Sequence, residues 1–354
     1  MMLSPEPQPT SVARPQSGWL RRWTKRIGIG VIGLLVALIA GGESYQLLGQ
    51  HRDASMYPAP GRLVDVSGSR LHLYSSGTGA IPVVLVAANG GGVLDWYKVQ
   101  PQLAKFTQVV SYDRAGTGWS EVSAEPRSSA RIVQELHTLL AKAGIKSPYV
   151  LVGHSLGGFH MQLYAMRYPE EVAGLVLVDS SHADMATRKE FVPKAFTMPT
   201  LVRLVGSLGV VRLLNGMNDR ANLRTPSEAG PGFVPELEHE SSMIYSHTGT
   251  LVAMAREFSA LPESAAQVRA ANLQLGDKPL FVLTRSGEPN PSPERRAIET
   301  IWMAWQADLA NRSHNVKHVV AEHSGHFIHQ DQPDLVVTAI KQTVLAARDK
   351  TKLR

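Results

Sequence analysis

Short apolar runs alternate with helical spacing over much of the chain after residue 60. Predicted buried strands are Pro82–Ala87, Gln108–Tyr112, the run that begins at Tyr149, and Gly174–Val178. Between them, apolar residues at helical spacing are clearest over Ser128–Ala143. Strands that alternate with helices are typical of a parallel, doubly wound sheet. The pattern therefore predicts an α/β fold.

The alternation stops after residue 182. From Ala183 to Gly276 the apolar spacing is helical and shows no convincing strand, which predicts an inserted helical cap. Strands resume at Pro279–Thr284 and Val316–Ala321, and a hairpin is expected around Ser67-Gly68-Ser69. The sheet should therefore be mostly parallel and have about eight strands. Two more helices are expected, over Pro293–Asn311 and Pro333–Ala347.

The front of the chain has a different pattern. Ile27–Gly42 is an uncharged apolar run of 16 residues, somewhat shorter than the roughly 20 residues of a typical membrane span. Residues 1–26 carry five Lys/Arg and one acid, which favours a cytoplasmic N-terminus. We expect an uncleaved membrane anchor; the alternatives are a secretory signal cleaved near Ala40-Gly41-Gly42 and a buried soluble helix. Either of the first two places the folded domain outside the cytoplasm, in a bacterial periplasm, at the cell surface or secreted.

These patterns divide the chain into six expected segments. They are a disordered basic N-terminus (1–26), an anchor or signal segment (27–48), a linker (49–60), a first core part (61–182), the helical cap (183–276) and a second core part (277–354).

Composition narrows the possible chemistry. The absence of cysteine excludes disulfide scaffolds, thiol catalysis and Cys-ligated metal sites. The net charge of +6 comes largely from the front segment, since residues 27–354 hold 31 basic and 29 acidic residues. A nucleic-acid surface is therefore not expected.

The chemistry points to one turn. The run from Tyr149 leads into Gly153-His154-Ser155-Leu156-Gly157, and a helical pattern follows. A serine in a sharp strand-to-helix turn needs small neighbours two positions before and after it, and Gly153 and Gly157 provide them. This order of elements is typical of a nucleophile elbow, with Ser155 as the exposed hydroxyl.

Four landmarks in order carry a resemblance to a known family. They are the Gly-rich loop Asn89–Gly92, the loop Asp113–Ser120 (Asp-Arg-x-Gly-x-Gly-x-Ser), the elbow, and Ser324-Gly325-His326-Phe327. With these, residues 60–348 resemble the α/β-hydrolase superfamily in its esterase- and lipase-like branch. The resemblance implies an α/β-hydrolase fold.

The resemblance also implies which residues carry the chemistry. Ser155 is the expected nucleophile and His326 the expected base, because the family places its histidine after a glycine. His323 and His329 are the competitors, and the three histidines together could alternatively be read as a metal site. His154 is expected to support the elbow.

The position of the acid departs from the common family pattern. Asn290 stands where many members carry aspartate, and an amide cannot stabilise an imidazolium as a carboxylate does. Some members place the acid after the sixth strand, where this chain has Asp179. We expect Asp179 to be the acid, with Glu288 and Glu294 as alternatives.

The expected oxyanion donors are the backbone amides of Leu156 and Gly91. A phosphate cradle is the alternative for the Gly-rich loop, although its sequence matches neither common motif. Asp113 and Arg114 are expected to brace the loops by ion pairing.

These features predict a serine hydrolase that cleaves an ester or lactone of a small, apolar substrate through an acyl-enzyme on Ser155. No cofactor and no metal is implied, and the oligomeric state is open. The alternatives are an amidase or peptidase with the same triad and a non-catalytic, membrane-tethered binding protein. Epoxide hydrolase or dehalogenase chemistry is disfavoured, because such relatives use a carboxylate at the elbow.

Overall fold

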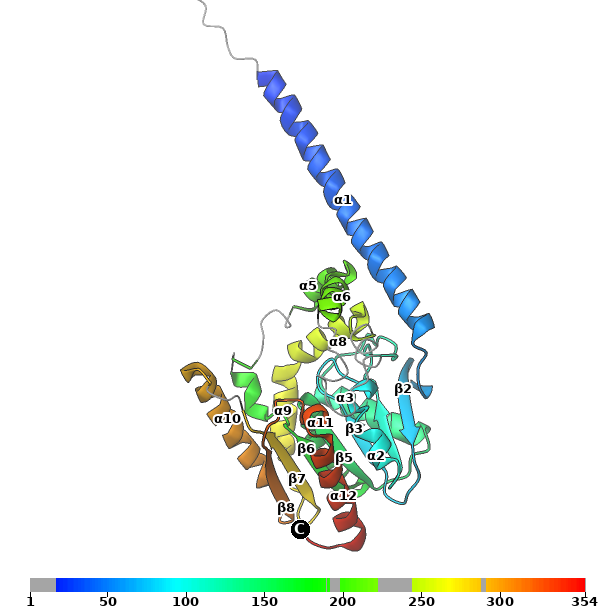
Figure 1. The fold of residues 1–354 in the computed structure, drawn as a ribbon, viewed down its shortest axis with the longest axis vertical. Helices are drawn as coiled ribbons and strands as arrows, with labels where there is room; N and C mark the ends of the chain where they lie inside the picture. Colours follow the sequence, from blue (N-terminus) through cyan, green and yellow to red (C-terminus); the bar gives the residue numbers. More distant parts are fainter. Residues whose placement is uncertain (1–16, 189, 192–197, 222–243, 288–290, 354) are drawn as a thin grey trace, which may run out of the picture.

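A computed structural model describes residues 17–188, 190–191, 198–221, 244–287 and 291–353 (Figure 1). Its centre is an eight-stranded sheet in the order β1-β2-β4-β3-β5-β6-β7-β8. The strands are β1 Arg62–Val66, β2 Ser69–Ser76, β3 Val83–Val86, β4 Val109–Tyr112, β5 Tyr149–His154, β6 Val172–Val178, β7 Leu280–Arg285 and β8 Val316–Ala321. β2 pairs antiparallel with β1 and β4, and the other neighbours run parallel. The predicted fold class is confirmed.

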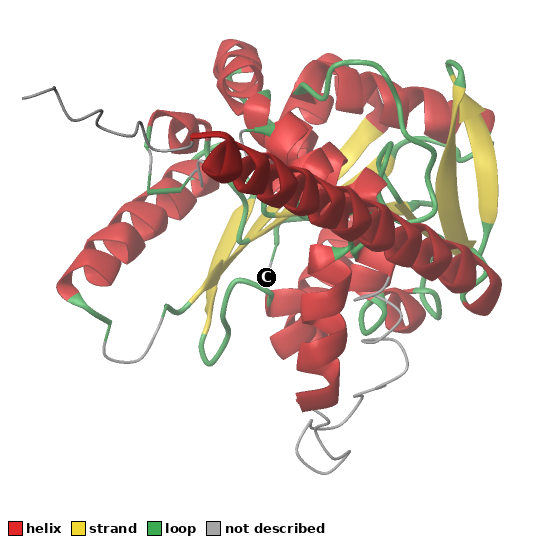
Figure 2. Cartoon of the chain, turned by 90° about the horizontal axis from the view of Figure 1, so that it is seen from above, coloured by secondary structure: helices red, strands yellow, loops and turns green. Residues whose placement is uncertain are grey.

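Helices cover both faces of the sheet (Figure 2). Within the described residues, the α-helices of this domain are α2 Gln100–Leu103, α3 Ser129–Lys142, α4 Leu156–Arg167, α5 Pro199–Ser207, α6 Val210–Ala221, α8 Thr248–Ser259, α9 Leu261–Ala271, α10 Pro293–Ala310, α11 Ile328–Asp331 and α12 Pro333–Asp349. The same part of the chain contains the short 3₁₀ helices η1 Val93–Trp96, η2 Pro169–Glu171 and η3 Ala183–Thr187.

The central strands are buried on both faces, which explains their continuous apolar sequence. In β3, Val84 and Val86 face the core built with α3, α4, α9 and α10. Val83 and Leu85 face the core built with α2 and α12. Successive strand residues point to opposite faces of the sheet, so each strand contributes side chains to both cores.

The segment between β6 and β7 was expected to form a cap over 183–276. Its elements among the described residues are all helical: η3, α5, α6, α8 and α9. Residues 189, 192–197 and 222–243 of the expected cap lie outside the described residues. α9 differs from the expectation, because Leu261, Ala265 and Val268 form an apolar stripe that joins the main core. α9 therefore belongs with the core helices beside α3 and α4.

Helix α1 runs from Ser17 to Met56, well beyond the apolar run Ile27–Gly42, and projects far from the domain (Figure 1). Two expectations are therefore wrong: residues 17–26 are helical rather than disordered, and residues 49–56 continue the helix rather than forming a linker. No proline interrupts residues 17–56, and contacts of Gln46 and Asp53 with the domain hold the last turns. Residues 1–16 lie outside the described residues.

Among the described residues, α1 is the one helix that is by itself long and apolar enough to cross a membrane. A signal sequence near an N-terminus shares these properties.

Candidate active site

The turn around Ser155 has the backbone that the sequence predicts. Ser155 lies between β5 and α4 with φ 51° and ψ −120°, a left-handed conformation that side chains adopt rarely. A Cβ on Gly153 would lie 2.3 Å from the Cα of Gly158, and one on Gly157 would lie 2.3 Å from the Val86 carbonyl oxygen. Only glycine fits at either position. The turn therefore fixes Ser155 at the carboxyl end of β5.

Asp179 and His326 come together at the same edge of the sheet. Asp179 follows β6 and is fully buried, and its Oδ2 lies 2.6 Å from His326 Nδ1. The two residues are 147 positions apart. His326 stands in the loop after β8, with about a third of its side chain exposed. The contact uses Nδ1 and fixes the orientation of the ring, so Nε2 is the ring nitrogen that does not contact Asp179.

Two residues that the sequence analysis did not single out bind the same carboxylate. Arg285, at the end of β7, donates from Nη1 to Asp179 Oδ2 at 2.7 Å and from its backbone amide to Oδ1 at 3.1 Å. Trp302 of α10 donates from Nε1 to Oδ1 at 2.7 Å. Burial alone would raise the pKa of Asp179, but the hydrogen bond from His326, the Arg285 charge and the bond from Trp302 outweigh it and lower the pKa. The carboxylate is thus held ionised.

The two residues were hard to foresee from the sequence. Trp302 lies 123 positions from Asp179. A charged residue at the carboxyl end of a buried strand, as Arg285 is, is the signal that could have marked it.

Ser155 and His326 line one cavity of about 570 Å³. Its other lining residues combine apolar and charged side chains: Ser181, Met185, Glu190, Phe191, Phe258, Arg285, Gly287, Arg295, Ile298, Glu299, Trp302, Gly325 and Phe327. The size suits a small organic molecule, since such sites usually span about 300–1,000 Å³.

The neighbouring histidines have supporting positions. His154 is buried and its Nε2 lies 2.8 Å from the backbone oxygen of His326. His329 is buried between Trp96 and His154, at ring-centroid distances of 4.8 and 4.4 Å. His323 is exposed. No group of three metal-ligating side chains is found in the described part of the chain.

The alternative acids differ from Asp179 in position. Glu294 is exposed in the first turn of α10, where bonds to the backbone and to the Ser292 hydroxyl lower its pKa. Glu288 and Asn290 lie outside the described residues.

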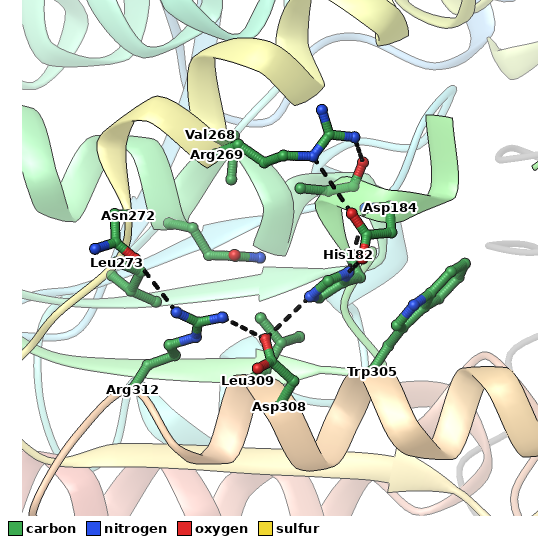
Figure 3. Close-up of a pocket in the computed structure, with 12 residues that line it drawn as sticks. His182, Asp184, Val268, Arg269, Asn272, Leu273, Trp305, Asp308, Leu309 and Arg312 are labelled. Carbon is green, nitrogen blue, oxygen red and sulfur yellow. Dashed lines mark hydrogen bonds and ion pairs between the residues drawn. The ribbon is translucent and has the colours of Figure 1, made fainter. Parts of the chain in front are cut away.

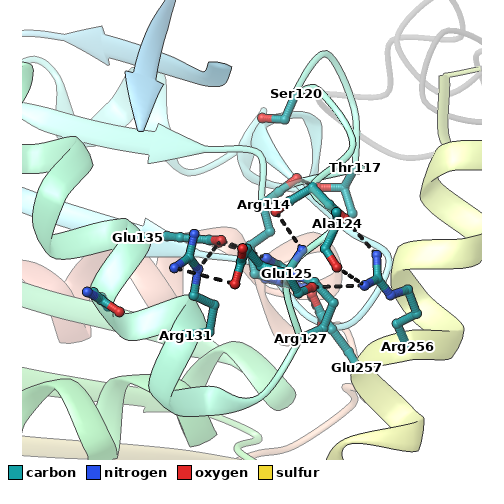
Figure 4. Close-up of polar contacts among 12 residues, drawn as sticks. Arg114, Thr117, Ser120, Ala124, Glu125, Arg127, Arg131, Glu135, Arg256 and Glu257 are labelled. Carbon is teal, nitrogen blue, oxygen red and sulfur yellow. Dashed lines mark hydrogen bonds and ion pairs between the residues drawn. The ribbon is translucent and has the colours of Figure 1, made fainter. Parts of the chain in front are cut away.

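Arg114 holds the start of the Gly-rich loop after β3, and Figure 4 shows this arginine beside Glu257. This buried guanidinium pairs with Glu257 at 2.8 Å and donates to the carbonyl oxygens of Ala87 and Ala88 at 2.8 and 2.6 Å. Asp113 accepts the Val93 amide at 2.8 Å and pairs with His72 at 2.8 Å. The expected bracing by Arg114 and Asp113 is present.

The two expected oxyanion donors differ in their surroundings. Leu156 opens α4, where the first amides of a helix have no carbonyl partner within the helix. The Gly91 amide donates to the Ala88 carbonyl oxygen at 3.1 Å. Arg114 also donates to that oxygen, so the Ala88 carbonyl has a second partner besides the Gly91 amide.

Comparison with known proteins shows which proteins this chain is similar to. The model of the α/β hydrolase fold matches residues 81–205. YqjL of Bacillus subtilis (strain 168), an uncharacterized protein, is 26% identical over 283 residues, which cover 80% of this chain and 91% of YqjL. The 2-hydroxymuconate semialdehyde hydrolase of Pseudomonas sp. (strain CF600) is 30% identical over 189 residues, 52% of this chain and 65% of that enzyme.

Solved structures agree at the level of the fold. An esterase from Thermogutta terrifontis with bound malate superposes with a TM-score of 0.58 at 22% identity, over 81% of this chain and 99% of the esterase. The epoxide hydrolase CorEH gives a TM-score of 0.61 at 20% identity, over 82% and 98% of the two chains. The family model and these structures together show that the chain has the α/β-hydrolase fold.

In this α/β hydrolase a second cavity, of about 450 Å³, lies between η3, α9 and α10 (Figure 3). Its charged side chains are mutually paired: His182 and Arg312 both bind Asp308, and Arg269 binds Asp184. His182 stacks on Trp305 at 5.5 Å. These bonds tie α10, the helix that supplies Trp302, to η3, and they tie η3 to α9.

Proposed function

We propose that this α/β hydrolase cleaves carboxylic esters or lactones through an acyl-enzyme on Ser155. The observation that carries the proposal is the 2.6 Å contact between His326 and the fully buried Asp179. A serine hydroxyl needs a base to become an effective nucleophile, and a carboxylate on the far nitrogen orients and stabilises that base. The shared cavity of Ser155 and His326 supports the same reading.

In the first half-reaction, Ser155 Oγ bonds to the substrate carbonyl carbon while His326 Nε2 takes the hydroxyl proton. The carbonyl oxygen becomes an oxyanion. When the carbon–oxygen bond to the leaving group breaks, His326 returns the proton to the departing alcohol. Throughout, the ionised Asp179 stabilises the positive charge on the imidazole, and Arg285 keeps that carboxylate ionised.

In the second half-reaction a water molecule attacks the acyl carbon of the ester on Ser155. His326 takes a proton from the water and passes it to Ser155 Oγ as the acyl–serine bond breaks. The acid product leaves and the enzyme is restored.

The oxyanion would be bound by the amides of Leu156 and Gly91. The amide of Leu156 already lies at the N-terminus of α4, where the helix dipole favours negative charge. The amide of Gly91 would exchange the Ala88 carbonyl oxygen for the stronger, charged acceptor. Loss of one such donor typically raises the barrier by about 3 kcal/mol.

The cavity lining supports a substrate with an apolar part. Phe191, Phe258, Trp302 and Phe327 supply aromatic surface near Ser155 and His326. Such side chains favour apolar acyl or alcohol groups because their contact removes apolar area from water.

We also propose that α1 anchors the enzyme in a membrane with the hydrolase domain on the non-cytoplasmic side. The basic residues before the apolar run support this orientation. Retention of the full chain in membranes after an alkaline wash, with residues 1–42 still present by mass spectrometry, is expected. Release of a chain that has been cleaved near Gly42 would contradict the anchor and show that the segment is a secretory signal.

The catalytic proposal is tested by labelling the full chain with a fluorophosphonate, which reacts with activated serines and requires no knowledge of the substrate. An adduct on Ser155, located by mass spectrometry, is expected. Ser155→Ala should lose it, whereas Ser181→Ala, a change in the same cavity, should keep it.

His326→Ala should abolish labelling, and His323→Ala, a change in the same loop, is the matched control. A folded protein that forms no adduct on Ser155 would contradict the serine mechanism and favour a non-catalytic binding protein. An adduct together with cleavage of anilides but not esters would make the enzyme an amidase.

A further inference from the structure

The hairpin formed by α5 and α6 presents an apolar surface to the outside. Residues 198–217 contain no acid and no lysine, and their charged residues are Arg203 and Arg212. The exposed side chains of this stretch are mainly large and apolar: Met198, Leu201, Leu204, Val205, Val210, Leu213, Leu214 and Met217. We call these eight residues the hairpin face. A contiguous apolar surface of this kind marks an interaction site.

The opposite side of the hairpin is fixed to the domain. Gly206 packs on α8, where an added Cβ would lie 3.1 Å from a methyl carbon of Leu251. Arg212 is buried, and its guanidinium lies 2.5 Å from Asp53 and 3.1 Å from the Gln46 side-chain oxygen. These bonds join the hairpin to the last turns of α1 and leave the apolar face outward.

The hairpin meets α1 at the end of the apolar run. A Cβ on Gly42, the last residue of that run, would lie 2.8 Å from the backbone oxygen of Leu208. A Cβ on Gly209 would lie 2.7 Å from the ring of Tyr45. The turn between α5 and α6 thus lies level with the point where α1 would leave the bilayer. Figure 1 shows α5 and α6 beside α1 at this end of the domain.

We propose that the hairpin face docks on the lipid bilayer and seats the hydrolase domain against the membrane surface. The proposal rests on the proposed role of α1 as an anchor. If Ile27–Gly42 lies in the bilayer, the same bilayer is the apolar medium next to the hairpin face. α5 and α6 have 9 and 12 residues; taken together they are long and apolar enough for one span, but the chain bends by 61° at the break between them. Each is too short to span a bilayer of about 30 Å, so the hairpin lies in the interface.

Arg203, the one exposed charged residue among residues 198–217, fits a position at the membrane surface. Arg203 is exposed among the apolar residues of α5. A long basic side chain can bury its stem and keep its charge at the level of the lipid head groups. The hairpin should therefore prefer membranes that contain anionic lipid.

The chain contains no cysteine, so one introduced cysteine is a unique labelling site. The full chain is reconstituted in vesicles of phosphatidylcholine and phosphatidylglycerol, and a nitroxide is attached at Leu204→Cys or Leu213→Cys. Collision of the nitroxide with oxygen, which is enriched in lipid, is compared with collision with a water-soluble nickel chelate. Leu35→Cys in α1 reports the anchor, and Lys352→Cys, at the far end of the domain, reports water.

We expect oxygen to dominate at residues 204 and 213, as at residue 35, and the nickel chelate to dominate at residue 352. Nickel-dominated collisions at 204 and 213 with residue 35 in lipid would overturn the docking while leaving the anchor intact. Protection of residues 204 and 213 from both reagents, with dipolar broadening between labels, would overturn docking on the bilayer and show that a second copy of the chain covers the hairpin face. Water exposure at residue 35 would overturn both anchor and docking. None of these readouts depends on catalysis, so a failed esterase assay leaves the result unchanged.

Discussion

Asp53 and Arg212 lie 159 residues apart in the chain and form a buried ion pair of 2.5 Å between α1 and α6. His247 Nε2 approaches the same carboxylate oxygen at 3.0 Å. Removing one partner of a buried pair typically costs about 3–5 kcal/mol, because the other charge stays desolvated. This pair therefore determines how firmly the hairpin is held to α1.

We predict that Asp53→Asn loosens the hairpin without disturbing the sheet. Amide hydrogen exchange in α5 and α6 should become faster, while exchange in β5 and β6 stays unchanged. Asp65→Asn, which removes an exposed partner of Lys142, should have no such effect. Equal exchange of the hairpin in the two variants would show that its apolar packing is sufficient without the ion pair.

Arg285→Met should shift the pH dependence of Ser155 labelling. The Arg285 charge is one cause that lowers the pKa of Asp179, so its removal should raise that pKa. Asp179 would then become protonated at higher pH, and the acid limb of the labelling profile should move to higher pH. Arg295→Met, in the same cavity, should leave the limb in place. An unchanged limb in Arg285→Met would mean that His326 and Trp302 suffice to keep the carboxylate ionised.

Gly153→Ala should destroy the elbow. The added Cβ would meet backbone atoms at 2.3 Å, a distance that no side-chain rotation relieves. We expect the free energy of unfolding to fall by about 1–3 kcal/mol, as for overpacked cores, and Ser155 not to be labelled. Gly216→Ala, in α6 with open space around it, is the matched control and should melt at or slightly above the wild-type temperature.

His329 should make the fold sensitive to acid. Burial, the charge of His326 and that of Lys98 lower the pKa of His329 to about 3. In the unfolded chain its pKa is about 6.5, so the unfolded state binds more protons between these values. The stabilising contribution is complete above pH 6.5 and is lost as the pH falls towards 3. His329→Phe should flatten this dependence in thermal unfolding, and His323→Phe should not.

Asp95 should act in the opposite direction. Burial and the charge of Asp113 raise the pKa of Asp95 to about 7. The folded state therefore holds a proton that the unfolded state has released, and this contribution is complete below about pH 3.8 and lost as the pH rises to 7. Asp95→Asn should make stability rise more steeply with pH over this window. Asp277→Asn, an exposed change, should leave the slope unaltered.

The sheet and the elbow were predictable because they depend on local sequence. The apolar runs at β3, β5 and β6 are short and rich in β-branched residues, which favours strands buried on both faces, and the glycines around Ser155 favour a sharp turn. The position of Asp179 was also predictable, because a polar residue at the end of a buried parallel strand lies at the edge of the sheet where the elbow lies.

The remaining features depend on contacts between distant segments. Trp302 reaches Asp179 only because α10 packs on β7 and β8. The last turns of α1 are helical where Gln46 and Asp53 meet the α5–α6 hairpin and α8, and neither partner is visible from the local sequence. Leu261, Ala265 and Val268 lie within the segment expected to form the cap, since periodicity predicts a buried face but not which element covers it.

The unbroken helix from Ser17 to Met56 has a consequence for how the anchored enzyme would meet its substrate. A flexible tether would let the domain tumble and sample the bulk solution above the membrane. A rigid helix bonded to the domain would instead hold the cavity lined by Ser155 and His326 at a fixed distance and orientation relative to the membrane. Encounters would then be a two-dimensional search, in which lateral diffusion in the bilayer replaces rotation of the enzyme.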